Sequence, residues 1–265
     1  YFTIYIRKIT DNKILTDKIS ETSGSITWSL DNKYIFYSKL DEHHRPRKIY
    51  RHKIGTQTKK DQLIYEEKDE GFTCGIGISS DEKYFFISTS DHTTSEVYFF
   101  DVNDTNQKPK LFKKRQKEIK YSTDSWKGNF FIHTNSNAED FKICICKHEN
   151  INQWQDYVPA TKGVLIGGFD LLNEWMIRSE LRDALPKLYV RNLNTNEEEE
   201  LVIAEEKIIT PGVSLMQKDR NTNELYIAYN SPKTPEKSYI YNIVTKEKKL
   251  IKELVSNGRE KGFVT

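Results

Sequence analysis

A pattern of turn residues followed by an apolar run recurs about every 45 to 50 residues along this chain. The copies are LDNKYIFYS around Tyr34, SDEKYFFIS around Tyr84, WKGNFFIHT around Phe130, LLNEWMIRS around Trp175 and NTNELYIAY around Leu225. A second pattern, of which IYRHKIGT at Ile49 is one copy, follows each of them and also occurs as IYIRKITDN at Ile4. Self-similarity at this period indicates a tandem array of one supersecondary unit.

Each period contains four strand-like runs. Between Ser23 and Lys68 they are GSITWSLD, KYIFYSKL, RKIYRHKI and DQLIYEEK, with Asn, Asp, Gly and Thr at the joints where hairpins need them. Helical periodicity is nearly absent. A β-sandwich is the competing all-β interpretation, but it does not require a repeat of this period. The pattern therefore predicts an all-β fold, a β-propeller of four-stranded antiparallel blades.

We expect one partial propeller domain over residues 1–265, with about five and a half blades. The chain begins inside a strand-like run without an initiator Met, so further sequence is expected upstream. Residues 1–20 are predicted to form the outer half of an earlier blade. The five full blades are expected at about 22–69, 70–117, 118–161, 162–206 and 207–254.

Composition excludes several classes of protein. The 41 basic and 39 acidic residues leave a net charge of +2, which disfavours a dedicated nucleic-acid binder. The 4 Trp, 15 Tyr and 13 Phe exclude a disordered chain. No apolar run approaches the ~18 residues of a membrane span, so we expect a soluble protein. Three cysteines are too few for a disulfide framework and indicate a reducing compartment.

No motif for catalysis, a metal or a cofactor stands out. The string nearest to a Gly-x-Ser-x-Gly elbow is GISSD from Gly77, which ends in Asp81. Cys144 and Cys146 share one strand face without a second ligand pair, so packing is favoured over a zinc site. We therefore predict no catalytic residue, no cofactor and no metal within this chain.

Two further sets of polar residues are interpreted as structural. Five of the six histidines, at positions 43, 44, 52, 92, 133 and 148, lie at or beside expected turns, so solvated loop histidines are favoured. The basic run Lys113, Lys114, Arg115 and Lys117 lies on an expected outer strand, where lysines protect an edge against pairing with other strands. From the residues alone, the chain is a scaffold or binding module.

Several loop strings resemble a known family. They are DEHHRPRKIYRHKIGT (41–56), LIYEEKDEGF (63–72), SDHTTSEVYFFD (90–101) and HTNSNAEDFKI (133–143). In order and spacing they closely resemble the oligopeptidase B group of the prolyl oligopeptidase family of serine peptidases, and the similarity extends from Phe2 to Lys252. The combination of RPRKIYRHKIGT with LIYEEKD is highly specific for that group.

The resemblance implies a seven-bladed propeller that covers an α/β-hydrolase domain holding the catalytic Ser, Asp and His. Residues 255–265 would then begin a linker toward that domain, and this chain alone would be inactive. The whole enzyme would be cytoplasmic and cleave short peptides after Arg or Lys, while the propeller excludes folded proteins. The implied partners are the hydrolase domain of the same protein and short basic peptides, with no nucleic acid and no membrane.

The expected strand order places the loops between second and third strands on the same rim as the connections between blades. The strings that resemble the family cluster there, so Arg45, Arg47 and Glu96 are candidates for docking onto the hydrolase domain. The alternative is that these strings only shape turns. A free-standing propeller that binds a protein or peptide is the alternative function. Uncovered blade faces and edges also predict self-association of the isolated chain.

Overall fold

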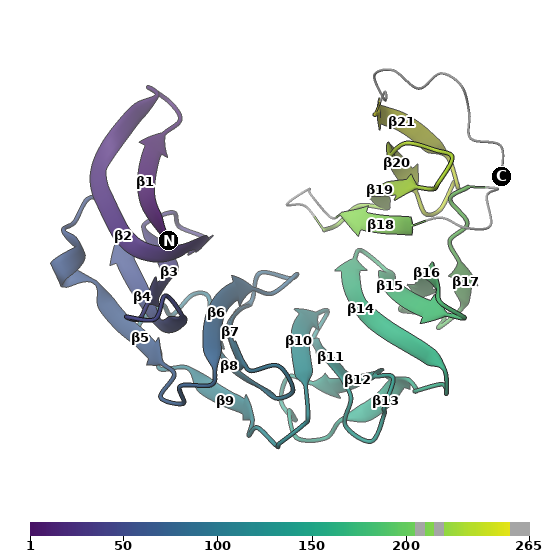
Figure 1. The fold of residues 1–265 in the computed structure, drawn as a ribbon, viewed down its shortest axis with the longest axis horizontal. Helices are drawn as coiled ribbons and strands as arrows, with labels where there is room; N and C mark the ends of the chain where they lie inside the picture. Colours follow the sequence, from purple (N-terminus) through teal and green to yellow (C-terminus); the bar gives the residue numbers. More distant parts are fainter. Residues whose placement is uncertain (205–209, 215–219, 255–265) are drawn as a thin grey trace. The chain divides into compact units, whose positions relative to one another are not determined.

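The computed structural model describes residues 1–204, 210–214 and 220–254, and in this part the chain forms five antiparallel sheets (Figure 1). In every sheet the strands pair in chain order, so each sheet is a meander. The expected linker at residues 255–265 lies outside the described residues. No helix in the described part is long and apolar enough to cross a membrane.

The predicted all-β propeller with four-stranded antiparallel blades is confirmed. The second to fifth sheets each have four strands. The strands of the second and third sheets are β6 (Thr73–Ile78), β7 (Tyr84–Ser90), β8 (Ser95–Asp101), β9 (Lys110–Lys113), β10 (Tyr121–Trp126), β11 (Asn129–Thr134), β12 (Lys142–Lys147) and β13 (Gln155–Val158). Those of the fourth and fifth are β14 (Val164–Leu172), β15 (Trp175–Arg182), β16 (Leu185–Asn192), β17 (Glu198–Glu200), β18 (Thr210–Ser214), β19 (Glu224–Asn230), β20 (Lys237–Asn242) and β21 (Lys248–Glu253).

The first sheet has five strands, and it corrects the predicted count of five and a half blades. Its elements are β1 (Phe2–Lys8), β2 (Lys13–Trp28), β3 (Tyr34–Leu40), β4 (Pro46–Lys53), the short 3-10 helix η1 (Thr58–Lys60) and β5 (Gln62–Glu66). Residue Thr22 of β2 pairs with Phe2 of β1 and also with Lys39 of β3. Because β2 continues through this point, β1 and the first half of β2 join the first sheet instead of standing apart as half a blade.

Glycine lets β2 bend without breaking. Gly24 has φ +87°, a left-handed conformation that costs glycine little. A Cβ atom at this position would also lie 2.9 Å from Cδ2 of Phe2. The register of the β2–β3 pair shifts between Thr22 and Ile26, on either side of this bend.

The chain divides into two compact units, which we describe separately. The first comprises residues 1–136 and 143–157 and holds the first three sheets, apart from terminal residues of β12 and β13. The second comprises residues 137–142 and the chain from Val158 onward, with the fourth and fifth sheets.

Aromatic side chains form the core of the first unit. The ring centroid of Phe36 on β3 lies 4.7 Å from that of Phe85 on β7, and Phe86 lies 6.1 Å from Phe130 on β11. Burying each such ring contributes about 1.5 to 3 kcal/mol relative to leaving it exposed. Cys144 and Cys146 belong to the cluster around Phe130, which agrees with the packing role expected for them.

Aliphatic side chains form the core of the second unit. Ile177 on β15 and Val190 on β16 pack in one cluster with Leu225 and Ile227 on β19, all of them buried. Val190, Leu225 and Ile227 alternate along their strands with more exposed residues, as expected of strands whose apolar face packs against a second sheet, whereas Ile177 lies between two buried residues.

His52 on β4 is fully buried, which corrects its assignment to the solvated loop histidines. Its Nδ1 lies 2.7 Å from Oδ1 of Asp61, and its Nε2 lies 2.8 Å from Oδ1 of Asp17. The physical reason is that its partner on β3 is Ile35, on a face that packs with Ile19 of β2. The sequence offers no sign that β2 covers this face.

The carboxylate of Asp17 is held in its charged form. Burial alone would raise the pKa of Asp17, but hydrogen bonds from His52 and from the backbone amide of Gly55 outweigh it and lower the pKa. The ring of His52 meets one carboxylate at each of its nitrogens. The cluster therefore joins β2, β4 and the segment between η1 and β5 through buried polar groups.

The His52→Gln variant should lose about 3 to 5 kcal/mol of unfolding free energy, because it removes the ring that binds two buried carboxylates. Urea unfolding followed by circular dichroism measures the change. His43→Gln is the matched control, because the His43 side chain is 67% exposed and should alter stability by no more than about 0.5 kcal/mol. Equal effects of the two substitutions would contradict this assignment.

Candidate functional site

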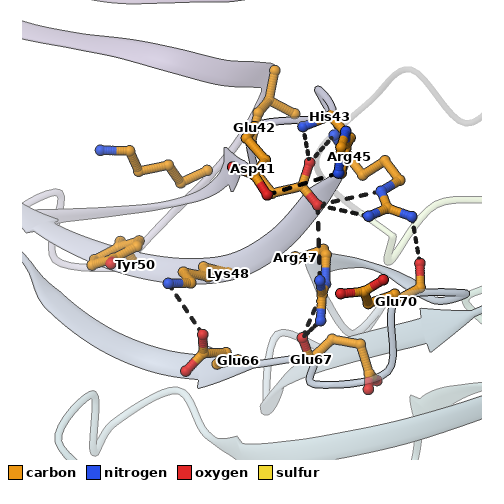
Figure 2. Close-up of a pocket in the computed structure, with 12 residues that line it drawn as sticks. Asp41, Glu42, His43, Arg45, Arg47, Lys48, Tyr50, Glu66, Glu67 and Glu70 are labelled. Atoms are coloured by element: carbon orange, nitrogen blue, oxygen red, sulfur yellow. Dashed lines mark hydrogen bonds and ion pairs between the residues drawn. The ribbon is translucent and has the colours of Figure 1, made fainter.

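A pocket of about 410 Å³ lies at the rim of the first sheet, between the β3–β4 hairpin and the connection that follows β5. We call it the rim pocket (Figure 2). Its lining is strongly charged, with cations and carboxylates side by side. The lining residues are Lys39, Leu40, Asp41, Glu42, His43, Arg45, Arg47, Lys48, Tyr50, Glu66, Glu67 and Glu70.

Asp41 organises the hairpin that carries the pocket. Its Oδ1 accepts hydrogen bonds from the backbone amides of His43 at 2.8 Å and Arg45 at 2.9 Å. His44 takes a left-handed conformation with φ 60°. An aspartate that bonds the backbone two residues on is a common turn former. The DEHHRP string thus shapes its turn, which is one of the two roles considered for it.

Two arginines reach from the hairpin to the connection after β5. Arg45 donates from Nε to Oδ2 of Asp41 at 3.2 Å and from Nη1 to the carbonyl of Glu70 at 2.6 Å. Arg47 donates from Nε and Nη2 to the carbonyl of Glu67 at 3.1 and 2.8 Å. In Figure 2 both guanidinium groups lie between Asp41 and the connection. The structure therefore brings the predicted residues Arg45 and Arg47 together.

Charge in the pocket is balanced locally. Burial alone would raise the pKa of Asp41, but bonds from the amides and guanidinium of this hairpin lower it below its ordinary value. Nζ of Lys48 lies 3.1 Å from Oε1 of Glu66. Such a surface, with both signs of charge interspersed, fits a polar protein surface better than a single small anion.

The second sheet repeats the relation between hairpin and connection. The backbone amide of Glu118, in the connection after β9, donates to Oγ1 of Thr94 in the β7–β8 hairpin at 3.0 Å. The amide of Ser95 donates to the carbonyl of Ile119 at 3.1 Å. In both sheets the middle hairpin and the outgoing connection therefore share one rim, as the strand order predicts.

Glu96, the third predicted docking residue, lies away from the pocket surface. It is 4% exposed and accepts bonds from Nε and Nη2 of Arg115 at 3.2 and 3.0 Å. Nη2 of Arg115 also donates to Oε2 of Glu67 at 2.6 Å. Glu96 is therefore linked to the rim pocket through Arg115 and Glu67.

The basic run predicted that Arg115 protects a strand edge, but in the structure Arg115 does not have this role. Its guanidinium carbon lies 4.0 Å from the ring centroid of Phe72, between the two carboxylates. Within the same run, Nζ of Lys113 lies 3.7 Å from the ring centroid of Trp154. The sequence carries no signal for these partners beyond the presence of an arginine among lysines.

The sequence shows no nucleophile beside a base, but the structure contains a serine and a histidine in contact. Nε2 of His148 lies 2.9 Å from Oγ of Ser125, which donates to Oδ2 of Asp81 at 2.8 Å. Burial lowers the pKa of His148 below its ordinary value. The hydroxyl proton of Ser125 is thus directed at Asp81 and not at His148. Ser125 is also fully buried, so this contact is structural.

Comparisons with known proteins agree with the fold. A family model described as "Prolyl oligopeptidase, N-terminal beta-propeller domain" matches residues 1–254. Protease 2 of Moraxella lacunata is 28% identical over 252 residues, covering 94% of this chain and 36% of that protein. Dipeptidyl aminopeptidase BI of Pseudoxanthomonas mexicana is 27% identical over 259 residues, covering 95% of this chain and 35% of that protein. The chain thus spans about a third of the length of these relatives.

Solved structures show the same similarity. Oligopeptidase B from Trypanosoma brucei, in a closed form with covalently bound antipain, superposes with a TM-score of 0.89. It is 25% identical, and the match covers 97% of this chain and 38% of the other. Oligopeptidase B from Leishmania major also gives a TM-score of 0.89, at 22% identity and over the same shares of the two chains. The resemblance inferred from the loop strings is therefore confirmed.

Stability should fall in acid partly because of Glu67. Burial alone would raise its pKa, but bonds from Thr89, the amide of Asp69 and Arg115 lower it below 4.5. A carboxyl with a lowered folded-state pKa stabilises the fold above its unfolded pKa, and this stability is lost as pH falls through the folded value. Urea unfolding between pH 7 and pH 3 should show a weaker pH dependence below about 4.5 for Glu67→Gln. An unchanged slope would contradict the assignment.

Proposed function

The chain belongs to the prolyl oligopeptidase family, as an N-terminal β-propeller domain, and from this premise we propose that it gates access to a peptidase active site. The whole protein would carry the catalytic Ser, Asp and His in an α/β-hydrolase domain, and the five sheets would form part of a seven-bladed ring. The observation that carries this proposal is the match of the propeller family along residues 1–254.

The gating is steric. A propeller that covers the active site admits flexible peptides and excludes folded proteins, and opening of the two domains would admit the substrate. The closed form of oligopeptidase B from Trypanosoma brucei, with covalently bound antipain, supports this. We propose cleavage of short peptides after Arg or Lys, in the cytoplasm, because the loop strings resemble the oligopeptidase B group.

The rim pocket is the part of the surface we propose for contact with the hydrolase domain. Arg45 and Arg47 lie in RPRKIYRHKIGT, which in combination with LIYEEKD is highly specific for this group, and their side chains are 34% and 16% exposed. Because both guanidinium groups are already held by backbone carbonyls, they meet a partner with little further loss of side-chain entropy. Glu96 is buried and would act on the rim pocket indirectly, through its bonds to Arg115.

The first test is hydrolysis of a fluorogenic Arg-Arg peptide by this chain, by a separately expressed hydrolase domain, and by their mixture. Activity that rises on mixing supports the gating domain. Activity of this chain alone would contradict the proposal, and a folded pair that stays inactive would favour the free-standing interaction propeller.

Sedimentation of the chain alone tests the proposed self-association, which a stable monomer would contradict.

Charge reversal at the rim should weaken closure. In the whole protein, Arg45→Glu and Arg47→Glu should each lower kcat/KM for the fluorogenic peptide by about tenfold, because a like charge at a complementary interface costs more than 1 kcal/mol. Arg7→Glu on the exposed face of β1 is the control and should leave kcat/KM unchanged. Unchanged kinetics in all three variants would exclude the rim pocket as the docking surface.

A further inference from the structure

Glu67 connects the rim pocket to the interior through its backbone carbonyl and its side-chain carboxylate. Its backbone carbonyl accepts both hydrogen bonds from Arg47. Its carboxylate points the other way and is 4% exposed. There Oε2 accepts from Thr89 at 2.6 Å, Tyr65 at 3.0 Å and Arg115 at 2.6 Å. The residue whose carbonyl holds Arg47 is therefore itself held by a buried carboxylate.

The carboxylate of Glu67 also sets the path of the connection after β5. Its Oε1 accepts a hydrogen bond from the backbone amide of Asp69 at 2.9 Å, and the carboxylate of Asp69 accepts one from the amide of Gly71 at 2.9 Å. The carbonyl of Glu70, which lies between them, binds Arg45. Both arginines of the pocket thus bind a loop whose conformation depends on the Glu67 side chain.

Arg115 is the cation that holds this side chain in place. It follows β9 and belongs to the second sheet, whereas Glu67 follows β5 of the first. Its guanidinium bonds Glu67 and Glu96, its backbone amide donates to Oε1 of Glu96 at 2.8 Å, and Tyr98 donates to Oε2 of Glu96 at 2.9 Å. One guanidinium thus neutralises two buried carboxylates, and without it they would repel each other in a poorly solvated site.

We propose that Arg115 is a positioning residue for the rim pocket, which through Glu67 fixes the places of Arg45 and Arg47. Arg115 does not line the pocket itself. The chain of contacts runs from Glu96 through Arg115 and Glu67 to Arg47, and it lies entirely within the first unit. Its consequence for docking rests on the proposed function, but the positioning itself does not.

Amide hydrogen exchange of this chain tests the proposal. Arg115→Met should speed exchange about tenfold or more in residues 41–48 and 66–72, because losing a hydrogen bond to a charged group shifts a local opening equilibrium by at least that factor. The reporting amides are those of Glu67, bonded to the carbonyl of Arg47, and Asp69, bonded to Glu67. Arg115→Lys keeps the charge but not the two-carboxylate geometry and should give a smaller increase.

Arg178→Met is the matched control. Arg178 is 3% exposed and pairs with Glu180 and Glu198 in the fourth sheet, so its loss also removes a buried cation. It should leave exchange in residues 41–48 and 66–72 unchanged. Equal acceleration of these segments by both variants would mean general destabilisation and would overturn the proposal, as would unchanged exchange in Arg115→Met. If Arg115→Met does not fold, the same criteria apply to Arg115→Lys.

A double variant separates positioning from simple stabilisation. Because Arg47 and Arg115 both act through Glu67, Arg47→Ala with Arg115→Met should accelerate exchange of residues 66–72 by less than the product of the two single effects. A full product would show independent action and overturn the proposal. If exchange responds as expected while Arg45→Glu and Arg47→Glu leave peptidase kinetics unchanged, only the docking role fails.

Discussion

Packing of one sheet against the next is the interaction on which the first unit depends. Middle strands such as β3 and β7 bury side chains on both faces. On β3, Phe36 faces the second sheet, whereas its neighbours Ile35 and Tyr37 pack against β1 and β2. Apolar burial is non-directional, however, so it does not by itself fix the loops at the strand ends. Polar contacts with defined geometry at the strand ends must therefore set where each hairpin and connection lies.

The turns that begin each repeat could be predicted because their interactions are local. Directly before LDNKY, Oγ of Ser29 donates to Asp31 at 2.7 Å and accepts the amide of Tyr34 at 2.9 Å. Directly before SDEKY, Ser79 makes the same pair of bonds with Asp81 and Tyr84, at 2.8 and 3.0 Å. Partners within five residues leave a visible motif, and its recurrence was enough to predict the four-stranded blades.

Interactions between distant segments could not be predicted in the same way. His52 depends on Asp17, 35 residues earlier, and Arg115 depends on Glu67, 48 residues earlier. Neither pair belongs to the repeated turn motifs, so the repeat gives no guidance. The continuous β2 was missed for a similar reason, since only the pairing of Thr22 with strands on both sides joins β1 to the first sheet. Of the candidate site, Arg45 and Arg47 were found through family strings and not through chemistry.

The clusters around Arg178 and Arg115 show what charge accomplishes in this fold. Arg178 bonds Glu180 and Glu198, all within the fourth sheet, so that cluster holds strands that are already paired. Arg115 instead bonds carboxylates that follow β5 and begin β8, in two different sheets. Apolar residues of similar size would stabilise either place at least as well, because buried ion pairs repay little beyond their desolvation cost. Apolar residues would not fix the position of the Glu67 carbonyl, which is the hydrogen-bond acceptor of Arg47.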